Sequence, residues 1–192
     1  MKKLSVMFIL LTLLLTGCGN KNTFDYDTEL ENLVNTYNSD KQCFADDYKE
    51  YLINNSSYRK LFNVIFNTSN ITAWSGQGNS VTCDVLIFNQ EEVQKKTLND
   101  AGFISDIKNL YELGIAQQEI DTYVYDYLAA TITQYNKVTG KVEASLTQST
   151  ESPFQFESAK PFVTYYDTQL SNLVYALEQS ALNYEALATS TD

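Results

Sequence analysis

The spacing of apolar residues changes four times along this chain, and this alternation of periods limits its fold more than any single motif. Residues 25–66 place apolar side chains every three or four positions, which predicts three helices, the second beginning near Ala45. Residues 70–76 and 80–89 instead alternate, with β-branched and aromatic residues on both sides of Gly76-Gln77-Gly78-Asn79. Turn residues between two alternating runs predict a β-hairpin.

The second half of the chain repeats this change of period. Residues 90–136 predict two helices with a break near Gly114, and residues 137–148 alternate again. Residues 154–157 form a shorter alternating run, and a last helix follows Lys160-Pro161. Runs of helices that flank short strands predict an α+β fold, with helices packed on a small antiparallel sheet and a C-terminal helix.

The first seventeen residues have the pattern of a secretory signal. Lys2 and Lys3 precede a mostly apolar run over residues 4–15, and the small residues Thr16 and Gly17 follow it. An uncleaved membrane anchor is the alternative. Spanning the hydrocarbon layer takes about 20 apolar residues, so a run this short favours a signal.

The end of this segment, Leu15-Thr16-Gly17-Cys18, resembles the lipobox of bacterial lipoproteins. In that family a peptidase cuts before the cysteine, whose sulfur carries a diacylglycerol, and two acyl chains anchor a protein stably. The resemblance implies a removed signal (1–17), a lipidated tether (18–24) and a position on the extracytoplasmic face of the cell membrane. An ordinary cleaved signal, with Cys18 left as a plain thiol, is the alternative.

Composition limits the partners and the chemistry of the rest. Residues 25–188 suffice for one extracytoplasmic domain, with residues 189–192 as a disordered tail. Without Lys2 and Lys3 the chain keeps 11 basic residues against 24 acidic ones, a formal net charge of −13. Such a surface repels polyphosphate, which argues against nucleic acid as a partner. The chain has no histidine, which removes the commonest general base and the commonest metal ligand but does not forbid chemistry by carboxylates, tyrosine or serine–lysine pairs. With no catalytic motif in the sequence, we expect no metal, no cofactor and no catalytic residues.

Three cysteines divide into Cys18 and the pair Cys43 and Cys83. An extracytoplasmic location permits a disulfide between the pair. It would close a loop of about 40 residues and contribute about 3–4 kcal/mol. Two buried free thiols are the alternative, because cysteine packs as a small apolar residue. The alternation of the second strand places Cys83 on the face that meets the helices, together with Val81, Val85 and Ile87.

The order of elements over residues 25–157 resembles the cone-shaped NTF2-like fold of small lipoproteins from low-GC Gram-positive bacteria. The resemblance depends on a helix ending in Leu61-Phe62 and Ile65-Phe66, then on two strands joined by a Gly-Asn turn and on a helical insertion. The chain departs from this pattern after residue 157, where a helix follows instead of long closing strands. The resemblance implies a pocket on the concave sheet face, lined by Trp74, Leu86 or Phe88. The fold by itself implies no function.

Fourteen tyrosines and Trp74 are the most unusual feature of the composition. Tyrosine joins apolar area to a polar tip and is frequent in binding surfaces. The tyrosines that we expect to line a cavity or to stack on a ligand fall into two groups: Tyr123, Tyr125, Tyr127 and Tyr135, and Tyr165, Tyr166 and Tyr175. Tyr123 and Tyr127 lie on a packing stripe and are predicted core residues. Tyr125 and Tyr166 lie off the predicted stripes, so with Trp74 they are predicted ligand contacts.

Adjacent carboxylates occur at Asp46-Asp47 and Glu91-Glu92. Paired acids serve acid–base chemistry or bind hard cations when their side chains converge. Neighbouring residues on a helix point about 100° apart, because a helix has 3.6 residues per turn. Solvated first turns of helices, where the helix dipole favours acids, are therefore the better interpretation.

These observations predict a membrane-tethered lipoprotein that binds or scaffolds another protein or peptide of the cell envelope without catalysis. Two alternatives stay open. One is an immunity or exclusion lipoprotein that sequesters a cationic peptide or an incoming phage or plasmid factor, which an acidic, tyrosine-rich surface would suit. The other is an NTF2-like enzyme that works through carboxylates and tyrosines.

Overall fold

The computed structural model describes residues 25–39, 52, 54–149 and 152–188 of the chain. Six α-helices and four strands form within these residues, which confirms the predicted α+β class. The helices are α2 (Tyr26–Ser39), α4 (Ser56–Thr68), α5 (Gln90–Leu98), α6 (Ala101–Glu112), α7 (Gln117–Thr131), followed by the 3₁₀ turn η1 (Ile132–Gln134), and α8 (Lys160–Ala188). The strands are β1 (Asn70–Gln77), β2 (Ser80–Phe88), β3 (Lys137–Ser149) and β4 (Ser152–Phe156).

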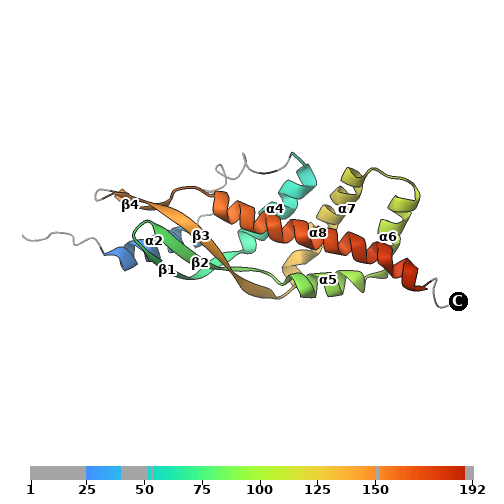
Figure 1. The fold of residues 1–192 in the computed structure, drawn as a ribbon, viewed down its shortest axis with the longest axis horizontal. Coiled ribbons are helices and arrows are strands. Elements are labelled where there is room, and N and C mark those ends of the chain that lie inside the picture. Colours follow the sequence, from blue (N-terminus) through green and yellow to red (C-terminus); the bar gives the residue numbers. More distant parts are fainter. Residues whose placement is uncertain (1–24, 40–51, 53, 150–151, 189–192) are drawn as a thin grey trace, which may run out of the picture.

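The molecule is elongated (Figure 1). The sheet and α2 form one end, and α5, α6 and α7 form the other. The long C-terminal helix α8 starts beside the sheet and continues along the helical end, so that one helix connects the two parts (Figure 1).

All neighbouring strands are antiparallel, in the order β1-β2-β3-β4. β1 and β2 form the predicted hairpin, and Gly78 in its turn has φ of 65°, a conformation that favours glycine. β3 pairs with β2 from Lys137 to Ser145, but β4 pairs with β3 only between Leu146 and Ser149. One edge of β3 is therefore paired along most of its length, whereas the opposite edge is covered by β4 only near its end.

The core lies between this sheet and the helices. On β2 the predicted inner face is confirmed, because four alternating residues are each at most 3% exposed: Val81, Cys83, Val85 and Ile87. On α2 the predicted stripe is buried as well: Leu30, Leu33, Val34 and Tyr37. Five predicted residues of α8 are also buried: Leu170, Leu173, Val174, Leu177 and Ala181.

Cys83 is a free thiol in the structure and is fully buried. Burial, with a smaller contribution from Asp84, raises the pKa of this thiol to about 12. Its proposed partner Cys43 lies outside the described residues, as does the helix predicted near Ala45. The disulfide therefore stays a prediction.

The packing face of α8 differs from the prediction at Tyr166. The prediction that it lies off the stripe is wrong, because its side chain is 0% exposed and its hydroxyl is 3.2 Å from that of Tyr37. The buried stripe begins earlier than predicted, at Phe162. Tyr166 follows Phe162 by four residues and precedes Leu170 by four, so all three share one helix face. Tyr166 is a core residue.

The helix expected between residue 90 and Gly114 is two helices, α5 and α6. Asp100 separates them, because its carboxylate accepts the N–H groups of Gly102 and Phe103 at 2.9 and 3.2 Å and so caps the start of α6. The predicted break near Gly114 is confirmed, since Gly114 has φ of 66° between α6 and α7.

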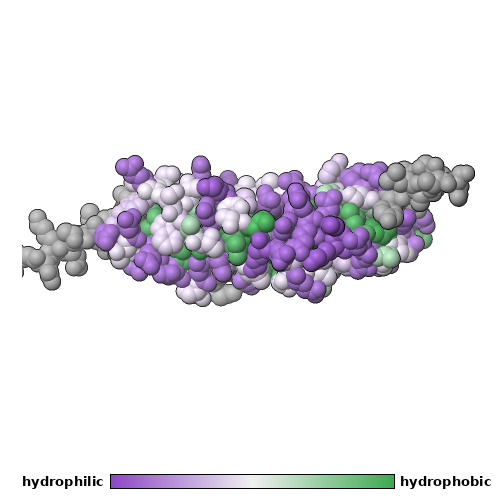
Figure 2. Space-filling model, turned by 90° about the horizontal axis from the view of Figure 1, so that it is seen from below, coloured by the Kyte–Doolittle hydropathy of each residue, from purple (hydrophilic) through white to green (hydrophobic). Residues whose placement is uncertain are grey.

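The visible face in Figure 2 is mostly hydrophilic, with hydrophobic residues in small separate areas. This distribution fits a chain with 24 acidic residues and a net charge of −11. In the part of the chain that the structure describes, each helix is too short or too polar to span a membrane.

Candidate functional site

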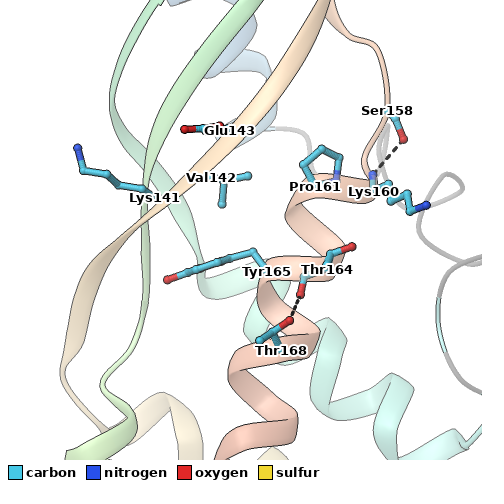
Figure 3. Close-up of a pocket in the computed structure, with 9 residues that line it drawn as sticks. All are labelled: Lys141, Val142, Glu143, Ser158, Lys160, Pro161, Thr164, Tyr165 and Thr168. Carbon is cyan, nitrogen blue, oxygen red and sulfur yellow. Dashed lines mark hydrogen bonds between the residues drawn. The ribbon is translucent and has the colours of Figure 1, made fainter.

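A groove of about 580 Å³ lies between β3 and the first turns of α8 (Figure 3). We call it the edge groove, because it follows the edge of β3 that β4 leaves uncovered. Three of its residues come from β3, and the others come from the segment that leads into α8 and from α8 itself. The lining residues are Lys141, Val142, Glu143, Ser158, Lys160, Pro161, Thr164, Tyr165 and Thr168.

The direction of the backbone groups of β3 follows from its pairing. Leu146 donates its N–H to the carbonyl of Asn79 on the β2 side at 2.9 Å, whereas the carbonyl of Ser145 accepts from Glu157 on the β4 side at 2.8 Å. Successive residues of a strand point their backbone groups to opposite edges. Odd-numbered residues therefore direct N–H and C=O toward the uncovered edge. Those beyond the reach of β4 are Thr139, Lys141 and Glu143, and within the described residues these edge groups have no hydrogen-bond partner.

Tyr165 reaches from α8 toward β3 beneath this edge (Figure 3). A Cβ atom at Gly140 would lie 1.7 Å from the Tyr165 hydroxyl oxygen, so the glycine makes room for the phenol. Burial raises the pKa of Tyr165, which keeps the ring neutral at physiological pH. Together with Val142 and Pro161, the ring supplies the apolar part of the groove lining.

The side-chain hydroxyls on the α8 side of the groove bond to nearby backbone groups. Thr168 donates its hydroxyl to the carbonyl of Thr164 at 2.7 Å, and Ser158 accepts the N–H of Lys160 at 3.1 Å. These hydroxyls are engaged by the backbone of their own segment, and Glu143 on β3 is the carboxylate among the nine lining residues. What the groove offers a ligand includes backbone hydrogen bonding, an apolar surface and the charges of Glu143 and Lys160, whereas Lys141 pairs with Asp84 at 3.6 Å.

The predicted ligand contacts do not come together. Trp74 is half-buried on β1 opposite Cys83, and Tyr125 is half-buried on α7 with its ring against Tyr58 at a centroid distance of 5.4 Å. Tyr166 lies in the core. Of the tyrosines expected to line a cavity, Tyr165 does line the edge groove.

Tyr123 and Tyr127, which were predicted as core residues, are half-buried and pack against the core. Their rings pack on Phe103, with centroid distances of 6.0 and 4.6 Å, and their hydroxyls donate to surface carboxylates of Asp106 and Asp100. Apolar contact through the ring and a hydrogen bond through the tip is the usual arrangement of tyrosine at a core boundary.

The predicted carboxylate pairs give no metal site where the structure describes them. Glu92 bonds to Lys96 at 2.7 Å in α5, which fits a solvated helix start, and Asp46-Asp47 lies outside the described residues. Within the described ranges no three His, Cys, Asp or Glu side chains are placed to hold a metal ion. Cys18, the predicted site of lipid attachment, also lies outside these ranges.

The local sequence pattern does not predict the edge groove. The alternation of residues 137–148 identifies the strand but not which of its edges is paired. The one local signal is Gly140, because a glycine inside a strand often marks a close approach of another group.

Comparison of the chain with protein-family models, with curated proteins and with solved structures gives no match. The α+β class is confirmed by the elements themselves, whereas the NTF2-like cone stays a prediction.

Proposed function

We propose that this chain is a lipoprotein held on the outer face of the cell membrane through diacylglycerol on Cys18, and that it binds an extended segment of an envelope partner in the edge groove without catalysis. The lipid anchor is supported by the lipobox resemblance of Leu15-Thr16-Gly17-Cys18. The binding role depends on one observation: Lys141 and Glu143 of β3 present unbonded backbone groups to an open groove.

Addition of a strand satisfies these backbone groups. An uncovered strand edge pairs readily with another chain, and main-chain hydrogen bonds supply the affinity in this mode of recognition. Each such bond contributes about 0.5–1.5 kcal/mol net. The flanking residues give the selectivity, because side chains of an added strand point alternately to its two faces. We expect apolar residues against Tyr165 and Val142, and a carboxylate near Lys160.

Filling the groove is expected to abolish this binding. Thr168→Trp places a large side chain in the groove, and Ser171→Trp places the same side chain on an exposed part of α8 outside it. Hexapeptides selected from a random display library on the wild-type protein should lose their binding to Thr168→Trp and keep it to Ser171→Trp. Selected peptides should also slow the hydrogen exchange of the Lys141 and Glu143 amides. Failure to select any peptide, or equal binding to both variants, would contradict the proposal.

The lipid anchor has a direct test. Cys18→Ala is expected to lose incorporation of radiolabelled palmitate and to leave the membrane fraction, because no other residue would carry the diacylglycerol. Cys83→Ala is the matched control and should keep the label, since Cys83 lies in the core. Equal labelling of wild type and Cys18→Ala would show that the lipobox interpretation is wrong.

A further inference from the structure

Two carboxyl groups meet between α7 and α8, at the helical end of the molecule. The side-chain amide of Gln117 donates to Asp121 Oδ1 at 2.8 Å and to Glu178 Oε2 at 2.9 Å. Its oxygen accepts from the hydroxyl of Tyr111 at 3.1 Å. One neutral amide therefore bridges two acids, which we call the acid pair: Asp121 and Glu178.

Glu178 is buried without a full set of partners. Glu178 is 6% exposed, and within the described residues its Oε1 atom has no hydrogen-bond partner. Burial, and then the neighbouring Asp121, raises the pKa of Glu178 to about 7. A buried carboxylate oxygen without a donor costs free energy, so a proton or a cation stabilises this site.

The Gln117 nitrogen occupies the position of a bridging cation. It lies within hydrogen-bond distance of both acids, but an amide is neutral and has two N–H groups, both already used. An ammonium group has a positive charge and three N–H groups, which leaves one for Glu178 Oε1. Gln117 is exposed and is the first residue of α7, so its side chain has room to turn toward solvent.

The other titratable groups near the acid pair are tyrosines. Burial raises the pKa of Tyr111 on α6, the hydrogen bond to Gln117 opposes this shift, and the charges of Glu178 and Asp121 add to it. Burial, and then Asp121, Glu178 and Asp167, raises the pKa of Tyr125 on α7 to about 12. Both phenols are neutral at physiological pH, so the charge of the site is that of the two carboxyl groups.

We propose that Asp121 and Glu178 bind the ammonium group of a lysine side chain of a cationic partner, in the place that the Gln117 amide occupies. The geometry supplies two carboxylates at bridging distance and one buried oxygen that lacks a donor. The acidic surface adds long-range attraction for a cationic partner, which salt weakens. The acid pair shares no residue with the edge groove, so this site is independent of the function proposed above.

The test uses N-acetyl-lysine methylamide as the probe and N-acetyl-norleucine methylamide as its uncharged control. Both are titrated into the full chain, and the side-chain amide signal of Gln117 is followed by ¹⁵N NMR. The lysine probe should shift this signal, and the norleucine probe should leave it unchanged. Binding should weaken about 30-fold from about pH 8 to about pH 5.5, because the proton on Glu178 competes with the ammonium group.

Three variants complete the experiment, with ring signals of Tyr111 and Tyr125 as the readout. Glu178→Gln should abolish binding, and Gln117→Ala should strengthen it by removing the competing amide. Gln117→Lys should supply the ammonium group from within the chain and block the probe. The proposal is overturned by no shift of the wild-type signal, by an equal response to norleucine, by binding that survives Glu178→Gln, or by binding that is stronger at the lower pH.

Discussion

Between about pH 5.5 and about pH 8.5 the free energy of unfolding is expected to fall by about 2 kcal/mol, and Glu178→Gln is expected to remove that fall. The folded state raises the pKa of Glu178 from 4.5 to about 7, through burial and the nearby Asp121. The folded protein therefore holds this proton more tightly than the unfolded chain does. The stabilisation is complete below about pH 4.5 and is lost as the pH rises through about 7.

This pH range distinguishes the effect of Glu178 from the effect of acids whose pKa values are lowered in the folded state. Hydrogen bonds to Thr28, Lys96 and Tyr127 lower the pKa values of Asp25, Glu92 and Asp100 respectively. Acids of that kind lose their stabilising contribution only as the pH falls below the usual carboxyl range. Above about pH 5.5, Glu178 therefore determines how the free energy of unfolding changes with pH.

Urea unfolding at several pH values measures this effect. Glu178→Gln should give a nearly flat profile and should be more stable than wild type at about pH 8.5 by up to about 2 kcal/mol. Glu119→Gln, an exposed substitution on α7, is the control and should keep the wild-type profile within about 0.5 kcal/mol. A wild-type stability that rises over this range would contradict the prediction.

Gly140→Ala is expected to lower the free energy of unfolding by about 1–3 kcal/mol. The added Cβ would lie 1.7 Å from the hydroxyl oxygen and 2.6 Å from the ring carbon Cζ of Tyr165, so the whole phenol must move. The ring is half-buried between β3 and α8, where it has neighbours on several sides. The cost comes from the ring being forced out of its packing.

A double-mutant cycle tests this cause. Tyr165→Ala removes the phenol, and in that background Gly140→Ala should cost close to nothing. Thermal unfolding of the four proteins gives the coupling between the two positions. An unchanged cost of Gly140→Ala in the Tyr165→Ala background would place its origin in the backbone rather than in the contact with the ring.

The period of apolar residues was sufficient to predict most elements of this fold, because it reports which face of an element is buried. It predicted α2, the hairpin of β1 and β2, and the packing face of α8 from Leu170 onward. It failed at Asp100, where one capping carboxylate ends a helical pattern without changing its period. It also failed at Tyr166, because a polar-tipped residue was assigned to the surface although it lies four residues before Leu170.

Neither site was predictable from local patterns. The edge groove exists because β4 pairs with only the last part of β3, and strand register is set by contacts distant in sequence. The acid pair depends on Gln117 meeting Glu178, which is 61 positions away in the chain. Single-residue features such as Gly140 or an isolated acid become informative only when the fold shows what lies opposite them.

Helix α8 sets the distance between the edge groove and the acid pair. Thr164 near its start and Glu178 about two thirds of the way along it are fourteen residues apart in one continuous helix, a rise of about 21 Å. An extended polypeptide covers that distance with about six residues. A partner that binds both the edge groove and the acid pair at once therefore needs a pairing segment and a lysine separated by about that interval. Shorter or longer separations would engage only one of the two sites.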